Sequence, residues 1–104
     1  MIQYLKKIFG FDKNQELENH IKNSFLVDVR TPAEFSNGHV KGSVNIPLNQ
    51  IPQKLTSFEG RESIVVFCAS GMRSSKAKKI LEDRGFKNVT NGGTWKSVNQ
   101  FIIH

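Results

Sequence analysis

The chain has 104 residues, of which 38% are hydrophobic, so it is long enough for one globular domain and too short for two. Fifteen basic and nine acidic residues give a net charge of +6, which favours anionic partners, but no nucleic-acid-binding motif is present and nucleic acid is not an expected partner. The single cysteine excludes an internal disulfide and a zinc site of several thiolates, and no metal or cofactor is expected.

Residues 1–11 are predicted to form an N-terminal helix, because Ile2, Leu5, Ile8 and Phe9 fall on one helical face. We favour packing of this face over the edge of the core, and a surface-lying membrane anchor is the alternative. The start lacks the apolar run and cleavage site of a signal peptide, and no stretch approaches the length of a membrane span. A cytoplasmic protein without membrane attachment is therefore expected.

A further helix and the first strand are predicted next along the chain. Asp12 and Gln15 resemble a helix-capping pair, and Leu17 and Ile21 supply an apolar stripe for the helix that would follow. Phe25–Val29 is a nearly continuous apolar run, which is typical of a strand buried on both faces.

The residues after this strand predict a short helix. Thr31 can cap it, Pro32 suits the first helical position, and Glu34 can reach back to the Thr31 amide. Gly38 is expected to end the helix after little more than a turn, and Ser43–Pro47 is expected to form a second strand.

The second half of the chain alternates in the same way. Helical spacing from Leu48 to Phe58 predicts a helix, interrupted early by Pro52, which is tolerable only in a first turn. The other expected elements are a central strand at Ile64–Phe67, a helix at Ser74–Arg84 stopped by Gly85 with Phe86 as the contact beyond it, a brief strand at Val89–Thr90 and a closing helix from Trp95. This alternation predicts an α/β fold with a small, mostly parallel sheet flanked by helices on both faces.

Cys68 follows the central strand directly, at the edge where open α/β sheets bind ligands. The next residues, Ala69–Arg73, begin with small side chains and include Gly71, which can adopt positive φ. Such a loop can form a nest of inward-pointing amides, and the following helix points its positive dipole end at the same place. These groups and the charge of Arg73, which can also fork onto an oxyanion, predict a Cys68 thiolate in an anion-binding cradle. A cysteine that only fills space is the alternative.

Three segments, in order, resemble the motifs of the rhodanese sulfurtransferases. Cys68–Ser74 resembles their active-site loop, C-x-x-G-x-R-S/T. Leu26–Phe35 with Gly38–Pro47 resembles their N-terminal signature, and Asn91–Trp95 resembles their G-G-x-x-x-W stretch with the tryptophan two positions early. The resemblance covers about residues 25–95 and implies a single rhodanese-like domain over residues 1–104.

What the resemblance implies is a thiosulfate sulfurtransferase. Cys68 would take the sulfane sulfur of a small anionic donor such as thiosulfate as a persulfide and pass it to cyanide, a thiol or a thioredoxin-like protein. The substrate-binding residues implied are Ala69, Ser70, Gly71, Met72, Arg73 and Ser74. Because the chain has no second thiol, the acceptor of the sulfur must be another molecule. The protein is also expected to be a monomer.

Two other functions remain open from the sequence. A sulfur-carrier or interaction module of the same family would receive sulfur from a protein and turn over small molecules poorly. Phosphatases and arsenate reductases related to rhodaneses place five residues between cysteine and arginine, whereas four lie between Cys68 and Arg73. The tighter loop suits one sulfur atom better than a tetrahedral oxyanion, so these activities are the lesser hypotheses.

The remaining polar residues are expected to be mostly structural. Arg30 and Glu34 stand four residues apart and can pair with each other, and Asp28 must be hydrogen-bonded or paired if its strand buries it. We favour scaffold roles for all three, with Arg30 facing the pocket as the alternative. His39 is expected to fix a turn, His20 and His104 to be solvated, and Trp95 to lie in the core.

Lysines stand at the helix end where the macrodipole disfavours them. Lys76, Lys78 and Lys79 lie near the N-terminus of the helix after Cys68, and Glu82 and Asp83 lie near its C-terminus. One hypothesis is that these lysines attract anionic donors to the pocket. The alternative is a solvated face on which the two later lysines pair with the acids four residues on.

Overall fold

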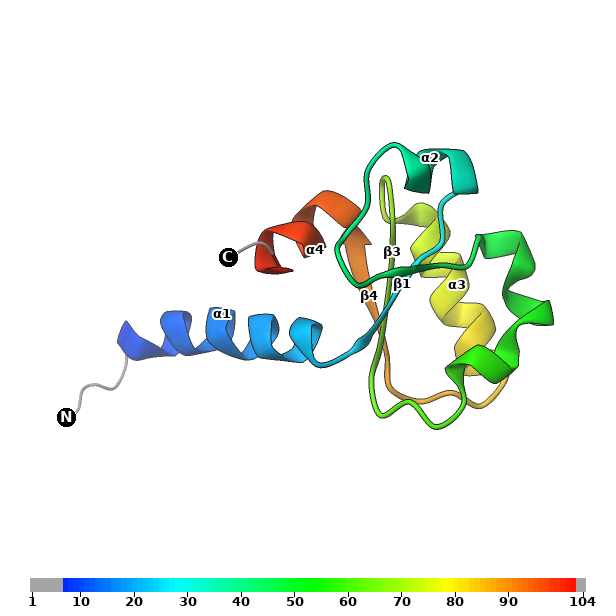
Figure 1. Ribbon diagram of the computed structural model, residues 1–104. Helices are drawn as coiled ribbons and strands as arrows, with labels where there is room; N and C mark the ends of the chain where they lie inside the picture. The colour runs from blue at the N-terminus through cyan, green and yellow to red at the C-terminus, as the bar shows by residue number, and fades with distance from the viewer. Residues whose placement is uncertain (1–6, 103–104) are drawn as a thin grey trace.

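The computed structural model describes the backbone of residues 7–102 and the side chains of residues 15–102, and it has an α/β architecture (Figure 1). Its sheet has four parallel strands in the order β2-β1-β3-β4. The strands are β1 Phe25–Asp28, β2 Val44–Asn45, β3 Ile64–Cys68 and β4 Val89–Thr94. The helices are α1 Lys7–Lys22, α2 Pro32–Ser36, α3 Met72–Asp83 and α4 Trp95–Ile102, with 3-10 helices η1 Leu48–Gln53 and η2 Leu55–Phe58. The expected fold class is confirmed.

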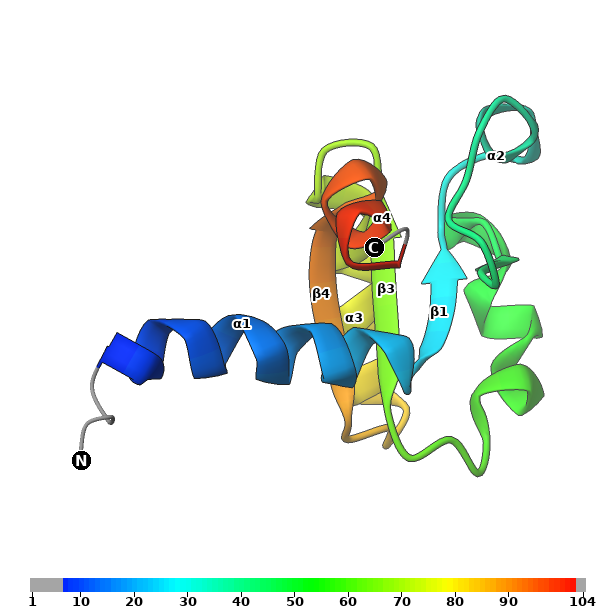
Figure 2. The same cartoon turned by 60° about the vertical axis from the view of Figure 1, so that its left-hand side comes forward.

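Helices α1 and α4 lie on one face of the sheet, and α3 lies on the other (Figure 2). A hydrophobic cluster packs on each face, one against α1 and α4 and the other against α3 and the 3-10 helices. All five residues of β3 are buried, and they alternate between the two clusters. Val65 and Phe67 face α1 and α4, whereas Val66 and Cys68 face α3. The central strand therefore places the cysteine on the α3 face, at the carboxyl edge of the sheet.

The predicted start of α2 is confirmed in detail. Thr31 accepts a hydrogen bond from the Glu34 amide, the Glu34 carboxylate accepts one from the Thr31 amide, and Pro32 occupies the first helical position. These reciprocal bonds satisfy amides that a helix of five residues would otherwise leave open. Gly85 likewise follows α3 in the left-handed region, with φ of 95°, as its place after the helix predicted.

The predicted helix start at Asp12 is wrong, because α1 runs without interruption from Lys7 to Lys22 and Asp12 lies inside it. A short polar residue three positions before Gln15 matches the capping pattern whether or not the chain is already helical. Residues 7–11 of the predicted N-terminal helix belong to α1, and residues 1–6 lie outside the described residues. The predicted packing of Ile8 and Phe9 concerns side chains outside that range.

The segment from Leu48 to Phe58 forms two 3-10 helices instead of the single helix that its spacing predicted. Pro52 has no amide hydrogen to donate, and the amides of Gln50 and Lys54 bond to carbonyls three residues back. The proline therefore limits the segment to short tight turns. Ile51 and Phe58 still reach the core that the spacing predicted for them.

Several element boundaries also differ from the predictions, those of β1 and β3 by a single residue. Strand β2 is shorter than expected, α3 begins two residues earlier at Met72, and β4 continues past Thr90 to Thr94. The pairing of β3 with β4 shifts register at Gly92, where a Cβ would lie 2.9 Å from Val98 Cγ2. A glycine there lets β4 pass close under α4 and carry Asn91 to Thr94 to the carboxyl edge.

Within residues 7–102, no helix is long and apolar enough to cross a membrane.

Candidate active site

The loop after β3 wraps around the sulfur of Cys68. Gly71 has φ of 95° and forms the N-cap of α3, so the chain turns sharply before the helix begins at Met72. The sequence predicted that Gly71 would adopt positive φ. This conformation is higher in free energy for a residue with a side chain than for glycine. Cys68 itself has no exposed surface, whereas Ala69 and Ser70 are exposed.

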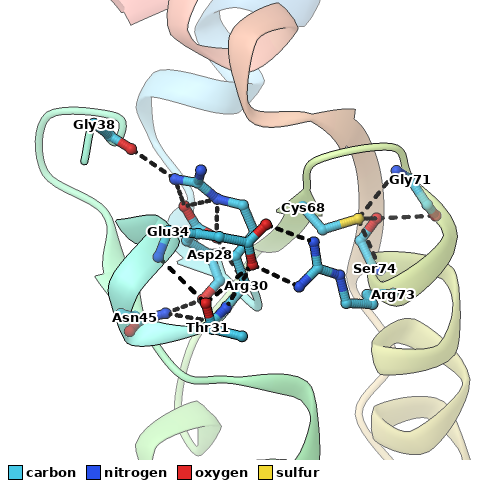
Figure 3. A network of polar contacts seen from close by, with 10 residues as sticks. All are labelled: Asp28, Arg30, Thr31, Glu34, Gly38, Asn45, Cys68, Gly71, Arg73 and Ser74. Carbon is cyan, nitrogen blue, oxygen red and sulfur yellow. Dashed lines mark hydrogen bonds and ion pairs between the residues drawn. The ribbon is translucent and has the colours of Figure 1, made fainter. Parts of the chain in front are cut away.

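Two backbone amides donate hydrogen bonds to this sulfur (Figure 3). The Gly71 N–H lies 3.0 Å from Sγ and the Ser74 N–H lies 3.4 Å from it, while Ser74 Oγ is 3.5 Å away. Burial raises the pKa of the Cys68 thiol and is the largest single influence on it. Hydrogen bonds from the Ser74 side chain and from the amides of Ser74, Ser70 and Gly71 together outweigh burial, so the pKa is lowered from its usual value. The site therefore favours a thiolate.

Arg73 forms a two-pronged ion pair with Glu34 rather than an open anion fork. Its two terminal nitrogens lie 2.7 and 3.0 Å from the two Glu34 oxygens, and the pair stands beside the sulfur loop (Figure 3). The hydrogen bond from Arg73, followed by that from the Thr31 amide, lowers the pKa of Glu34 to about 2, and the pair raises the pKa of Arg73. The predicted pairing of Arg30 with Glu34 is wrong, because Glu34 faces the loop and ties α2 to the start of α3.

Arg30 instead binds the buried carboxylate of Asp28. Its Nε and a terminal nitrogen lie 2.7 to 3.0 Å from the Asp28 oxygens, and the same terminal nitrogen donates to the Gly38 carbonyl at 2.7 Å. The guanidinium carbon lies 4.6 Å from the centre of the Trp95 ring. Asp28 is paired, as its burial required, and Arg30 joins β1 to α4 and to the loop before β2. This arrangement supports a scaffold role for both residues.

Asn91 is a polar residue of the site that the sequence interpretation did not single out. Its Oδ1 accepts hydrogen bonds from Ser74 Oγ at 2.7 Å and from the Gly93 amide at 2.9 Å. Its position immediately before Gly92 and Gly93, in the segment that resembles the third rhodanese motif, was the available signal. The spacing could not show that its amide would meet the sulfur loop.

The other predicted residues have mixed outcomes. His39 bonds to the Phe35 carbonyl at 2.8 Å and stacks on the Phe35 ring, so it fixes the end of α2 as expected. The prediction that His20 is solvated is wrong, because it is half-buried and its Nε2 lies 3.2 Å from Thr90 Oγ1. Trp95 is half-buried, and His104 lies outside the described residues.

The lysines of α3 follow the alternative interpretation in part. Lys78 lies 4.0 Å from Glu82, and Lys79 lies 3.4 Å from Asp83, so both belong to solvated pairs. Lys76 is exposed and takes part in no ion pair among the side chains of residues 15–102. Met72, in the first turn of α3, is also largely exposed, at 71% of its surface.

The model of the rhodanese-like domain matches residues 13–94 of this chain. The chain belongs to the rhodanese-like family. The Escherichia coli thiosulfate sulfurtransferase PspE is 32% identical over 74 residues, which are 69% of this chain and 71% of that protein. A thiosulfate:glutathione sulfurtransferase of Saccharomyces cerevisiae is 29% identical over 92 residues, 76% of this chain and 66% of that one. An E. coli rhodanese solved with anions has a TM-score of 0.66 and 32% identity, covering 70% of this chain and 88% of its own.

The relatives point to one kind of activity for this chain. The rhodanese-like family includes sulfurtransferases and sulfur carriers, and sulfur transfer is the activity that the relatives support. The resemblance of the Cys68 loop to their active-site motif led to the same family from the sequence.

Proposed function

We propose that the protein is a thiosulfate sulfurtransferase that carries sulfur as a persulfide on Cys68. The observation that carries this proposal is the pair of hydrogen bonds that two backbone amides donate to the sulfur of the only cysteine. The amide nitrogen of Gly71 lies 3.0 Å from Sγ, and that of Ser74 lies 3.4 Å from it. Amides fixed by the fold stabilise negative charge on sulfur without reorganising during the reaction.

The reaction has two displacement steps at sulfur. The Cys68 thiolate attacks the sulfane sulfur of thiosulfate, an S–S bond forms on Cys68, the S–S bond of thiosulfate breaks, and sulfite leaves with its electron pair. The persulfide then carries the negative charge on its outer sulfur. Cyanide or an external thiol attacks that sulfur, and the thiolate of Cys68 leaves. No general base is needed when the attacking group is already a thiolate, which is consistent with the bonding of His39 to α2.

The Arg73–Glu34 pair argues against phosphate chemistry at this site. A phosphatase loop uses its arginine to fork onto the phosphate oxygens, whereas both prongs of Arg73 bind a carboxylate. The four-residue gap between Cys68 and Arg73 also leaves a smaller ring. The sulfur atom is therefore the better fit to the loop.

A sulfur carrier that exchanges sulfur with another protein is the second candidate. Two observations favour it: Cys68 has no exposed surface, and the apolar side chain of Met72 stands exposed beside the loop. A partner that packs on Met72 could reach an outer sulfur more easily than the buried Sγ. Such a carrier would load sulfur and release it slowly to small acceptors.

The test is the formation of thiocyanate from thiosulfate and cyanide by the purified protein. We expect ping-pong kinetics, with loss of turnover in Cys68→Ser and full turnover in Ser36→Ala, a matched serine control at the end of α2. A sulfurtransferase of this kind is excluded if the folded wild-type protein forms no thiocyanate or if Cys68→Ser retains the wild-type rate. Sulfur loading without turnover would select the carrier instead.

A further inference from the structure

The hydroxyl of Ser74 has one proton and two oxygen acceptors within reach. It also lies beside the sulfur of Cys68, which donates to Ser74 Oγ as a thiol and can only accept from it as a thiolate. Asn91 Oδ1 lies 2.7 Å from Ser74 Oγ, the Gly71 carbonyl oxygen lies 3.1 Å away, and the sulfur of Cys68 lies 3.5 Å away (Figure 3 shows the last two). A hydroxyl donates only one hydrogen at a time. The acceptor that takes this proton therefore decides whether Ser74 presents a donor or a lone pair to the sulfur.

Two backbone groups fix which atom of Asn91 faces Ser74. The Gly93 N–H donates to Oδ1 at 2.9 Å, and Nδ2 points at the Gly71 carbonyl at 3.4 Å. Turning the amide over would set N–H against N–H and oxygen against oxygen at these two places. The amide oxygen of Asn91 thus faces Ser74, and the short Oγ–Oδ1 contact requires Ser74 to donate to it.

We propose that Asn91 is a positioning residue that competes with the sulfur of Cys68 for the hydroxyl proton of Ser74. When Sγ is neutral, as in a thiol or a persulfide with its charge on the outer sulfur, the Ser74 proton stays with Asn91. When Sγ is a thiolate, the hydroxyl rotates and donates to the sulfur, and the bond to Asn91 is lost. Asn91 therefore favours the protonated and sulfur-loaded forms of Cys68 over the bare thiolate.

The charged groups near the sulfur are bound to each other in pairs. From α2 and α3 these groups are Glu34 and Arg73, which bind each other, and from the end of β1 they are Asp28 and Arg30, which also bind each other. The pKa of Glu34 is about 2 and that of Arg73 is raised, so neither changes charge near neutral pH. All four residues stay unchanged in the variants below.

The test is an ultraviolet titration of the thiolate, with the absorbance of the matching Cys68→Ala protein subtracted to remove the signal of the single tyrosine. The difference reports Cys68 alone because the chain has one cysteine. Removing the competing acceptor in Asn91→Ala or Asn91→Leu should lower the pKa of the thiol and raise its thiolate fraction below that pKa about three- to tenfold. Ser74→Ala should raise the pKa, because the hydroxyl donor is gone. Asn88→Ala, at an exposed position just before β4, is the matched control and should leave the pKa unchanged.

The double variant Ser74→Ala/Asn91→Ala decides whether Asn91 acts through Ser74. We expect the effect of Asn91→Ala on the pKa to vanish in the Ser74→Ala background. The proposal is overturned if both Asn91 variants leave the pKa of the thiol unchanged or raise it. A raised pKa would mean that Asn91 only holds the loop in place, because a loosened loop weakens the amide hydrogen bonds to the sulfur. The proposal is equally overturned if the pKa falls by the same amount without Ser74.

A second measurement rests on the proposed function. At a fixed ratio of thiosulfate to sulfite, Asn91→Ala should hold about three- to tenfold less persulfide relative to thiolate, because the thiolate alone gains the Ser74 proton. An unchanged ratio beside a lowered pKa overturns the part of the proposal that concerns the loaded form. The titration needs no sulfur donor, so a protein that titrates as expected but loads no sulfur would refute only the proposed function.

Discussion

The buried pair of Asp28 and Arg30 makes the strongest prediction about stability. Asp28 has no exposed surface, and the Arg30 side chain donates three of the four hydrogen bonds that Arg30 makes to its carboxylate. Arg30→Ala would leave that carboxylate buried without a cation and would also remove the donor to the Gly38 carbonyl and the contact with Trp95. Breaking a buried pair from one side costs about 3 to 5 kcal/mol of unfolding free energy.

Such a loss is a large part of the stability of a domain of this size. It corresponds to a fall in Tm of more than about 12 °C. Arg30→Lys keeps the charge and loses the fork, so it should fall between the wild type and Arg30→Ala. Asp28→Asn/Arg30→Met carries no lone charge and should recover much of the loss.

Urea unfolding measures these differences, followed by circular dichroism and by the fluorescence of Trp95, the only tryptophan. Arg84→Ala is the control, because Arg84 is exposed at the end of α3 and its loss should change the free energy of unfolding by less than about 0.5 kcal/mol. A loss below about 1 kcal/mol for Arg30→Ala would refute the scaffold role, and so would a double variant no more stable than Arg30→Ala.

Three further predictions concern the single residues Gly92, Glu34 and Lys76. Gly92→Ala should destabilise the protein by about 1 to 3 kcal/mol in urea unfolding, since its Cβ would lie 2.9 Å from Val98 Cγ2, and an unchanged midpoint would contradict this packing. Glu34 has a lowered pKa in the folded state, so its share of the stability is present above pH 4.5 and is lost as the pH falls toward about 2. The side chains of Arg73 and Glu34 are 34% and 37% exposed, so solvent screening limits this share to about 1 kcal/mol or less. Glu34→Gln should therefore lose less stability than the wild type as the pH falls from 4.5 toward 2. An equally steep loss in the variant would count against the ion pair. Lys76→Gln should raise the KM for thiosulfate and weaken its dependence on salt, whereas unchanged kinetics would rule out steering by this lysine.

Local rules predicted the parts of this structure that depend on neighbours in sequence. The capping box from Thr31 to Glu34 involves residues three apart, and the turn at Gly71 needs a residue that accepts positive φ. The apolar runs and the helical spacing between them also depend only on nearby residues, and they predicted the order of the strands and helices. The position of Cys68 at the end of the central strand followed directly.

Contacts between distant segments were not predictable from spacing. Arg73 and Glu34 are 39 residues apart, and Ser74 and Asn91 are 17 apart, so no helical or strand period relates them. Both Asp28 and Glu34 lie close enough to Arg30 in the sequence to pair with it. Arg30 binds Asp28 because Asp28 is buried, and a buried charge without a partner costs far more free energy than an exposed one. The fold supplies these partners only once the sheet order is set.

The most direct test of sulfur transfer at this site is the intact mass of the protein after incubation with thiosulfate. We predict a gain of one sulfur atom on the wild-type chain, lost again on addition of cyanide and absent in Cys68→Ala. Sulfur that stays bound after cyanide, sulfur that still loads on Cys68→Ala, or a folded wild-type chain that gains none would contradict a persulfide on Cys68.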